Sequence, residues 1–319
     1  MYYVGIDLGG TNIVAAVVND KYEILGTGKI KTDLPREADL IFDDMASATR
    51  TAVENAGLTM QDIEYVGVGS PGTVNPKTGY IEYANNLGFD NLPARQMLEE
   101  RLGKTVYLGN DANCAALGEA LAGCGNGVDN FVAVTLGTGV GSGIIIDGKI
   151  VTGVNYAGGE CGHMIINVDG LKCTCGRHGC WEAYASATAL INQTKEAMEQ
   201  NPNSNMWELV RENNGKVSGR TAFDAMRNGD ETGKEVVDKY IKYVATGIVN
   251  LINALQPEII CVGGGICNEG ETLLEPLRDY VFKCRYSKFS PNQTKLLKAE
   301  LGNNAGIIGA ALLGVTNNG

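Results

Sequence analysis

Three cysteines and one histidine have residue types and spacing that could hold a metal ion. Cys173, Cys175 and Cys180 fall within eight residues, and His163 precedes them. Three thiolates and one imidazole form a common closed tetrahedral set for zinc, although C-x-C is not the usual C-x-x-C spacing. A disulfide between Cys173 and Cys175 would be strained, and an iron–sulfur cluster would want a fourth cysteine nearby. The pattern therefore favours a metal site.

Glycine-rich turns follow three apolar runs that are typical of buried strands. The turns consist of Gly9, Gly10, Thr11 and Asn12, of Gly137, Thr138 and Gly139, and of Gly263, Gly264 and Gly265. A turn without Cβ atoms lets backbone N–H groups approach an anion such as phosphate, although glycine is also an ordinary turn residue. None of the three is a Walker A loop, and the second leads back into a strand, which argues against a dinucleotide fingerprint.

Two aspartates stand at the ends of predicted strands. Asp7 ends an apolar run, where an ionised side chain is costly unless it is paired. It either holds Mg²⁺ that is shared with substrate phosphates or caps its own turn. Asp111 follows Asn110 at a predicted strand-to-helix junction. It is either a helix N-cap or a general base on a rigid scaffold, and the residues alone leave both alternatives open.

Together these motifs resemble a known family. Residues 5–12 (GIDLGGTN), 137–144 (GTGVGSGI) and 262–266 (VGGGI) are similar to the two phosphate motifs and the adenosine motif of the sugar kinase, actin and Hsp70 superfamily. With residues 110–113 (NDAN) and the cysteine segment, they resemble the ROK family of repressors, uncharacterised reading frames and sugar kinases. More narrowly, they resemble its bacterial glucokinases. The likeness covers nearly the whole chain, in order.

The resemblance implies an ATP-dependent hexose kinase, in the first place a glucokinase that forms glucose 6-phosphate with Mg²⁺ bound to ATP. Asp111 is then the general base, which takes the proton of the sugar hydroxyl during in-line phosphoryl transfer. The implied sugar ligands are Gly72, Asn86, Asn110, Asp111, Glu160, His163 and Glu182. The implied nucleotide ligands are Asp7 and the three glycine turns, namely Gly9, Gly10, Thr11, Asn12, Gly137, Thr138, Gly139, Gly263, Gly264 and Gly265.

The family segment CxCGxxGCxE implies that the metal is structural zinc. The implied ligands are His163, Cys173, Cys175 and Cys180. His178 falls on a variable position of that segment and is expected to be exposed. Two residues depart from the family pattern, because Cys161 replaces a bulky aliphatic residue and Phe89 replaces a tryptophan. The effect of these departures stays open.

The elements that must position these residues suggest two related α/β halves. Residues 4–18 and 132–146 share one strand–turn–strand pattern. Further strands are predicted over 24–29, 65–68, 106–109 and 258–262, and helices over 37–56, 112–122 and 304–313. The implied fold is the two-domain actin/hexokinase/Hsp70-like (ribonuclease H-like) α/β fold with a deep interdomain cleft. We expect a smaller domain over 1–115, completed by a C-terminal helix at about 302–319, and a larger domain over 116–301 with the zinc-binding loop.

Composition limits the classes of partner. The chain has 319 residues, of which 44% are hydrophobic, enough for roughly two domains. Its net charge of −11 and the lack of a basic stripe make nucleic acid and anionic membranes poor partners. No apolar run approaches the ~18 residues of a membrane span, and the N-terminus lacks the features of a signal peptide. We expect a cytoplasmic protein, and the family implies a homodimer or higher homo-oligomer.

Several alternatives to a glucokinase stay open. The first is a ROK kinase for mannose, fructose, allose or N-acetylmannosamine. The second is a sugar-sensing ROK regulator, for which we expect no room, because the first phosphate motif begins at residue 5. The third is a nucleotide switch of the actin or Hsp70 type, which would leave Glu160, His163 and Glu182 without a role. Polyphosphate is an alternative to ATP as the phosphate donor.

Overall fold

The structure is a computed structural model that describes residues 1–317 and divides into two compact units. Unit 1 comprises Met1–Ala133, Gly143–Gly159 and the C-terminal segment from Ala299, and unit 2 comprises Val134–Ser142 and Glu160–Lys298. Residues 116–133, 143–159 and 299–301, which we assigned to the larger domain, thus belong to unit 1. Where the functional domains divide stays a prediction. The last two residues of the expected C-terminal helix, 318–319, lie outside the described residues.

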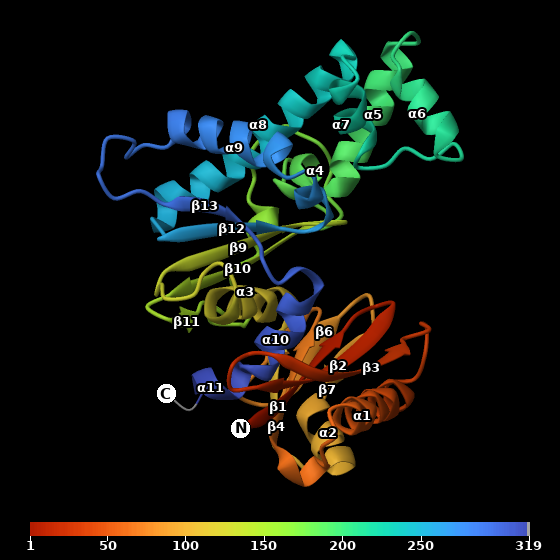
Figure 1. The fold of residues 1–319 in the computed structure, drawn as a ribbon, viewed down its shortest axis with the longest axis vertical. Coiled ribbons are helices and arrows are strands. Elements are labelled where there is room, and N and C mark those ends of the chain that lie inside the picture. Colours follow the sequence, from red (N-terminus) through yellow and green to blue (C-terminus); the bar gives the residue numbers. More distant parts are fainter. Residues whose placement is uncertain (318–319) are drawn as a thin grey trace. The chain divides into compact units, whose positions relative to one another are not determined.

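Unit 1 is built on a five-stranded sheet in the order β3-β2-β1-β4-β8 (Figure 1). Its strands are β1 (Tyr2–Leu8), β2 (Asn12–Asn19), β3 (Ile24–Lys31), β4 (Ile63–Ser70) and β8 (Val106–Asn110). β1, β2 and β3 form an antiparallel meander, whereas β1, β4 and β8 run parallel. All five strands were predicted, and each extends beyond its predicted bounds because backbone pairing continues past the apolar residues.

Helices cover both faces of this sheet. α1 (Ala38–Asn55) packs against β2 and β3 and buries its apolar side, which includes Ile41 and Phe42. It ends before Gly57, whose φ of +71° suits a residue without a side chain. On the other face, α10 (Ala305–Ala311) packs against β1, β4 and α3 (Asp111–Ala122). A Cβ at Gly5 would lie 1.9 Å from the carbonyl oxygen of Ile307, so glycine is required for this close packing.

A three-stranded sheet in the order β5-β6-β7 was not predicted. Its strands are β5 (Thr73–Asn75), β6 (Tyr80–Ala84) and β7 (Phe89–Leu92), which are too short to give a clear alternating pattern. Gly72 leads into β5 with a φ of +90°, and a Cβ there would lie 2.0 Å from the carbonyl oxygen of Tyr83. The other helices of unit 1 are η1 (Met60–Asp62), α2 (Ala94–Leu102), η4 (Gly302–Asn304) and α11 (Leu313–Asn317).

A second five-stranded sheet repeats the strand order of the first. Its order is β11-β10-β9-β12-β13, and its strands are β9 (Phe131–Leu136), β10 (Val140–Ile146), β11 (Lys149–Ile150), β12 (Ile259–Gly263) and β13 (Lys295–Lys298). In the first sheet β1 lies between β2, which returns from the glycine turn, and β4, which follows a long helix. In the second sheet β9 lies in the same way between β10 and β12. The shared order supports the internal repeat inferred from residues 4–18 and 132–146.

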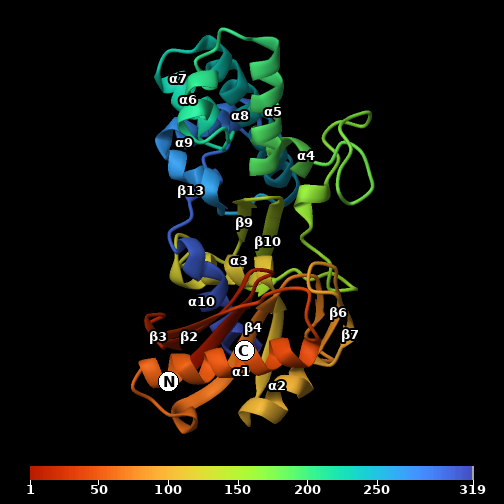
Figure 2. The ribbon, with the colours of Figure 1, turned by 90° about the vertical axis from the view of Figure 1, so that its right-hand side faces the viewer.

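The helices of unit 2 pack around one long helix. They are η2 (Cys161–His163), α4 (Glu182–Ala185), α5 (Ala187–Gln200), α6 (Met206–Glu212), α7 (Thr221–Arg227), α8 (Glu231–Leu255), η3 (Gly265–Glu269) and α9 (Glu271–Cys284). α8 contacts α4, α5, α7 and α9 (Figure 2). Trp181 is fully buried beside α8, and its indole Nε1 donates to the carbonyl oxygen of Tyr243 at 2.8 Å. No described helix is both long and apolar enough to cross a membrane.

Candidate functional site

The predicted residues of unit 1 follow three neighbouring parallel strands. In the register of the sheet, Asp7 of β1 pairs with Gly69 of β4, and Ser70 of β4 pairs with Asn110 of β8. The carboxyl ends of parallel strands meet at one edge of a sheet, which is the usual place for ligands in open α/β sheets. Asp7, Gly72 and the Asn110–Asp111 pair therefore belong to the same edge.

Asn110, and not Asp111, is the N-cap of α3. Its Oδ1 accepts hydrogen bonds from the backbone N–H groups of Ala112 at 2.9 Å and Asn113 at 3.2 Å. Its Nδ2 donates to the carbonyl oxygen of Gly72 at 3.1 Å, which ties two predicted sugar ligands together. Asp111 is the first residue of the helix, so the N-cap interpretation of Asp111 is wrong. The capping requirement of α3 is met without its carboxylate.

Burial disfavours the charge of both aspartates. Burial raises the pKa of Asp111, although the backbone N–H of Ala112 acts in the opposite direction with a 2.8 Å hydrogen bond. Burial also raises the pKa of Asp7 to about 6, and the negative charge of Asp111 adds to that effect. A divalent cation would stabilise two such desolvated carboxylates. The arrangement therefore fits Mg²⁺ beside Asp7 and a proton acceptor at Asp111.

The first glycine turn is held by a residue that the sequence analysis missed. The N–H of Gly9 donates to the carbonyl oxygen of Asn12 at 2.9 Å, which closes the turn. Thr32 is fully buried, and its Oγ1 donates to the carbonyl oxygen of Gly9 at 2.7 Å. A Cβ at Gly10 would lie 3.8 Å from Nδ2 of Asn86, so the predicted sugar ligand Asn86 is near this turn. Thr32 is far from the turn in sequence, and no motif marked it.

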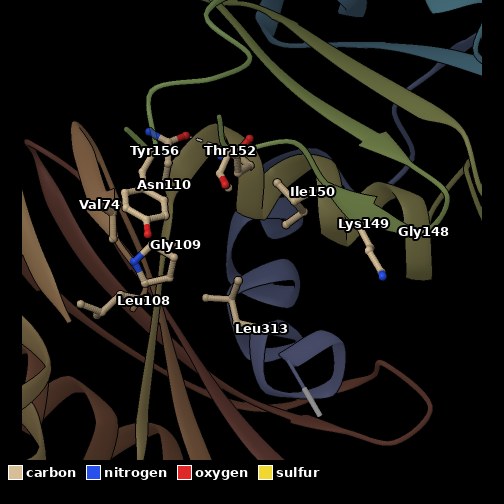
Figure 3. Close-up of a pocket in the computed structure, with 12 residues that line it drawn as sticks. Val74, Leu108, Gly109, Asn110, Gly148, Lys149, Ile150, Thr152, Tyr156 and Leu313 are labelled. Carbon is tan, nitrogen blue, oxygen red and sulfur yellow. Dashed lines mark hydrogen bonds between the residues drawn. The ribbon is translucent and has the colours of Figure 1, made fainter. Parts of the chain in front are cut away.

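A pocket of about 280 Å³ borders Asn110. Val74, Leu108, Ile150 and Leu313 give it an apolar wall (Figure 3). Asn113 also lines it, is 5% exposed, and its Oδ1 has no hydrogen-bond partner among the described residues. No sequence motif indicated this pocket, since its lining comes from segments that are distant in the chain.

The four predicted zinc ligands of unit 2 come together. One ligand atom of each of His163, Cys173, Cys175 and Cys180 lies within 4.8 Å of the others. Sγ of Cys173 is 3.7 Å from Nδ1 of His163, and the Sγ atoms of Cys175 and Cys180 are 3.6 Å apart. Zinc bonds of about 2.0–2.3 Å in a tetrahedron put ligand atoms about 3.3–3.8 Å apart. The cluster therefore fits one zinc ion with four protein ligands.

The backbone of the cysteine segment wraps tightly around these ligands. Gly176 has a φ of +90° and Gly179 a φ of +78°. A Cβ at Gly179 would lie 1.7 Å from the carbonyl oxygen of Asn167, so only glycine fits there. Because Nδ1 of His163 faces Cys173, its Nε2 is left to donate to another group. His178 is exposed, as expected.

The second and third glycine turns lie side by side in unit 2. Gly137 N–H donates to the carbonyl oxygen of Gly139 at 3.0 Å. Gly264 has a φ of +92°, and a Cβ there would lie 2.4 Å from the carbonyl oxygen of Leu136. Leu136, which precedes the second turn, therefore packs against Gly264, the middle residue of the third turn. Two glycine turns that are predicted to bind the nucleotide thus pack against each other, although they are far apart in the chain.

Glu182 lies between the metal ligands and the second glycine turn. Its Oε2 accepts a hydrogen bond from the backbone N–H of Val140 at 3.0 Å, and its Oε1 accepts one from Oγ1 of Thr174 at 3.4 Å. The other predicted sugar ligand of this segment, Glu160, is exposed and directly precedes η2. Cys161 is 6% exposed, and its N–H donates to Oγ of Ser142 at 3.0 Å. Its small side chain is thus buried in the position of the usual aliphatic residue.

Comparison with known proteins gives consistent matches over the whole chain. The model of the ROK family matches residues 3–316. A glucokinase of Halalkalibacterium halodurans is 36% identical over 98% of this chain and 94% of its own length, and one of Thermotoga maritima is 35% identical over 97% and 95%. Among solved structures, a ROK family glucokinase from Streptomyces griseus in complex with glucose and AMPPNP matches with a TM-score of 0.82 and 35% identity, covering 98% of this chain and 99% of that one.

Proposed function

We propose a function for this chain from one premise: it belongs to the ROK family. Its fold is the α/β fold of the ROK sugar kinases, of the actin and hexokinase type. The function is that of an ATP-dependent glucokinase, which converts ATP and D-glucose to ADP and glucose 6-phosphate. The observation that carries this conclusion is the full-length similarity to a glucokinase whose structure holds glucose and AMPPNP.

In the proposed reaction, Asp111 accepts the proton of the sugar hydroxyl as that hydroxyl attacks the γ-phosphate. The position of Asp111 at the start of α3 supports this role, because the hydrogen bonds of Asn110 fix the backbone on either side of it. Burial raises the pKa of Asp111, which makes its carboxylate a better proton acceptor. Most of the rate would come from positioning and electrostatics, as is general for phosphoryl transfer.

The sugar ligands fall into two groups in the proposal. Gly72, Asn86, Asn110 and Asp111 come from unit 1, and Glu160, His163 and Glu182 come from unit 2. Sugar hydroxyls both donate and accept hydrogen bonds, so carboxylates, amides and an imidazole N–H suit them. The direction of the His163 ring supports the role proposed for that residue, because Nδ1 faces the metal ligands and Nε2 is left for the sugar.

Two metal ions belong to the proposal. Zn²⁺, held by His163, Cys173, Cys175 and Cys180, would be structural, since four protein ligands leave no open position. Mg²⁺ would neutralise charge on the ATP phosphates, with Asp7 holding it directly or through water. The three glycine turns, 9–12, 137–139 and 263–265, would bind the nucleotide through their backbone N–H groups. The protein would work in the cytoplasm as a homodimer or higher homo-oligomer.

A coupled assay with purified protein tests the function. Glucose, mannose, fructose, allose and N-acetylmannosamine are each offered with MgATP, and then glucose is offered with polyphosphate. We expect glucose with ATP to give the highest kcat/KM. A higher value for another sugar would reassign the enzyme to that hexose, and a higher value with polyphosphate would change the donor. Turnover of no sugar, with retained sugar binding, would favour the regulator.

A further inference from the structure

The segment that follows the last proposed zinc ligand is hydrogen-bonded to two residues of the second glycine turn and to the residue after it. Besides the bond from Val140 N–H to Glu182, the N–H of Ala187 donates to the carbonyl oxygen of Gly137 at 2.8 Å. Oγ1 of Thr188 donates to the carbonyl oxygen of Thr138 at 2.8 Å. The turn therefore takes its position from α4 and the start of α5, and not only from its own strands.

Glu182 packs against the third residue of the turn. A Cβ at Gly139 would lie 2.3 Å from Oε2 of Glu182, so the carboxylate rests directly on the Gly139 backbone. The oxygen that accepts the Val140 N–H is thereby occupied, whereas Oε1 faces Thr174 in the cysteine segment. One carboxylate thus contacts both the proposed phosphate-binding turn and the loop of the metal ligands.

The position of Glu182 depends in turn on the metal loop. Cys180 precedes it by two residues, and Trp181 between them is fully buried and hydrogen-bonded to the backbone of α8. Trp181 fixes one side of Glu182. The carboxylate of Glu182 also contacts the metal loop directly, because its Oε1 lies 3.4 Å from Oγ1 of Thr174 and 3.8 Å from Sγ of the proposed ligand Cys173.

We propose that Glu182 and Thr188 are positioning residues for the nucleotide, so that occupancy of the His163, Cys173, Cys175 and Cys180 cluster sets the affinity for ATP and ADP as well as that for sugar. This inference rests on the proposed function, since it takes residues 137–139 as part of the nucleotide site. Coupling between two sites is reciprocal. Bound nucleotide therefore strengthens zinc binding by the same factor by which zinc strengthens nucleotide binding.

The test measures the Kd of MgADP by calorimetry with no sugar present. Glu182→Ala should raise this Kd about tenfold, because the Val140 N–H loses a charged acceptor. In Glu182→Gln the Kd of MgADP should stay within about threefold of the wild-type value, since the amide oxygen can accept the same hydrogen bond. Thr188→Val should also raise it, whereas the matched control Thr246→Val, on the exposed side of α8, should not. Zinc content and thermal melting of each variant show that the metal loop and the fold are intact.

Zinc removal gives the second arm. Protein stripped by a chelator should bind MgADP about tenfold more weakly, and adding zinc back should restore the affinity. Saturating MgADP should slow the loss of zinc to the chelator. If the Kd of MgADP were unchanged in both Glu182→Ala and the stripped protein, the proposed coupling would be wrong. The proposed function would still stand if the wild-type protein phosphorylated glucose. A wild-type protein that neither binds MgADP nor phosphorylates glucose would overturn both.

Discussion

Asp7 and Asp111 stand at the carboxyl edge of one sheet, and the charge of Asp111 adds to the burial that raises the pKa of Asp7 to about 6. The backbone N–H of Ala112 donates to Oδ1 of Asp111 at 2.8 Å, but burial outweighs this bond and raises the pKa of Asp111. The unliganded protein thus holds two desolvated acidic groups where MgATP and sugar are proposed to react. This arrangement costs stability and favours a bound cation.

Asp7→Asn should stabilise the unliganded protein at pH 8 and about half as much at pH 5. A carboxylate whose pKa rises from 3.8 to about 6 on folding destabilises the folded state when ionised, and this penalty disappears as pH falls through 6 towards 4. After allowance for partial exposure, we expect a gain of about 1–2 kcal/mol at pH 8. Urea denaturation at the two pH values, with exposed Asp20→Asn as the control, measures it. An equal gain at both pH values would contradict the assignment.

Asp111→Asn should remove turnover and keep sugar binding. The amide keeps the shape of the side chain but cannot accept a proton at neutral pH, so kcat should fall about 10²–10⁴-fold. The Kd of glucose, measured by calorimetry, should change less than about tenfold. Turnover close to that of the wild type would exclude Asp111 as the general base.

Cys175→Ser should lower both zinc content and sugar affinity, although no sulfur is proposed to touch the sugar. Loss of one ligand loosens the loop that carries His163 and Glu182, so the Kd of glucose should rise about 10–100-fold. Metal analysis and calorimetry on the same sample measure both quantities. Cys284→Ser is the control, because Cys284 is exposed and lies outside the cluster. If the Cys175 variant kept zinc and glucose affinity, the metal would not position the sugar ligands.

Gly264→Ala and Gly265→Ala form a pair of neighbouring substitutions with opposite expectations. The first puts a Cβ 2.4 Å from the carbonyl oxygen of Leu136 at a φ of +92°, whereas the second meets no atom within 4 Å. We expect Gly264→Ala to lower the free energy of unfolding by about 1–3 kcal/mol and to raise KM for ATP. Gly265→Ala should leave the melting temperature unchanged. Equal melting temperatures for the two variants would refute the close packing of the two turns.

Local patterns in the sequence predicted the strands and turns that carry the motifs. Asp7, Gly137 and Asn110 each follow an apolar run. Such runs form buried strands because burial of apolar side chains is the largest favourable contribution to the free energy of folding. The repeated strand–turn–strand pattern predicted that β1 is followed by its returning strand β2 and β9 by β10, but it did not predict where the other strands of either sheet lie. The proposed metal site was indicated because three of its four ligands are close in sequence, whereas its assignment to zinc came from the family resemblance.

Contacts between distant segments could not be predicted in this way. Nothing near Glu182 in the sequence indicates that it accepts a hydrogen bond from Val140, and nothing near Thr32 indicates that it holds Gly9. The short strands of the third sheet, such as β5, have too few residues for periodicity to appear. Asn110 and Asp111 are adjacent, and either residue type can cap a helix. The sequence therefore could not show which of the two side chains accepts the hydrogen bonds at the start of α3.

The repeated strand order lets equivalent connections in the two halves be compared. In the first half, residues 32–37 join the third strand, β3, to helix α1, whereas in the second half residues 151–181 join β11 to α4. All four proposed zinc ligands lie in this longer connection, outside every strand of the sheet. It can therefore gain or lose residues without shifting the register of any strand. Changes in the length of this one connection can alter the residues beside the proposed sugar site while both sheets keep their strand order.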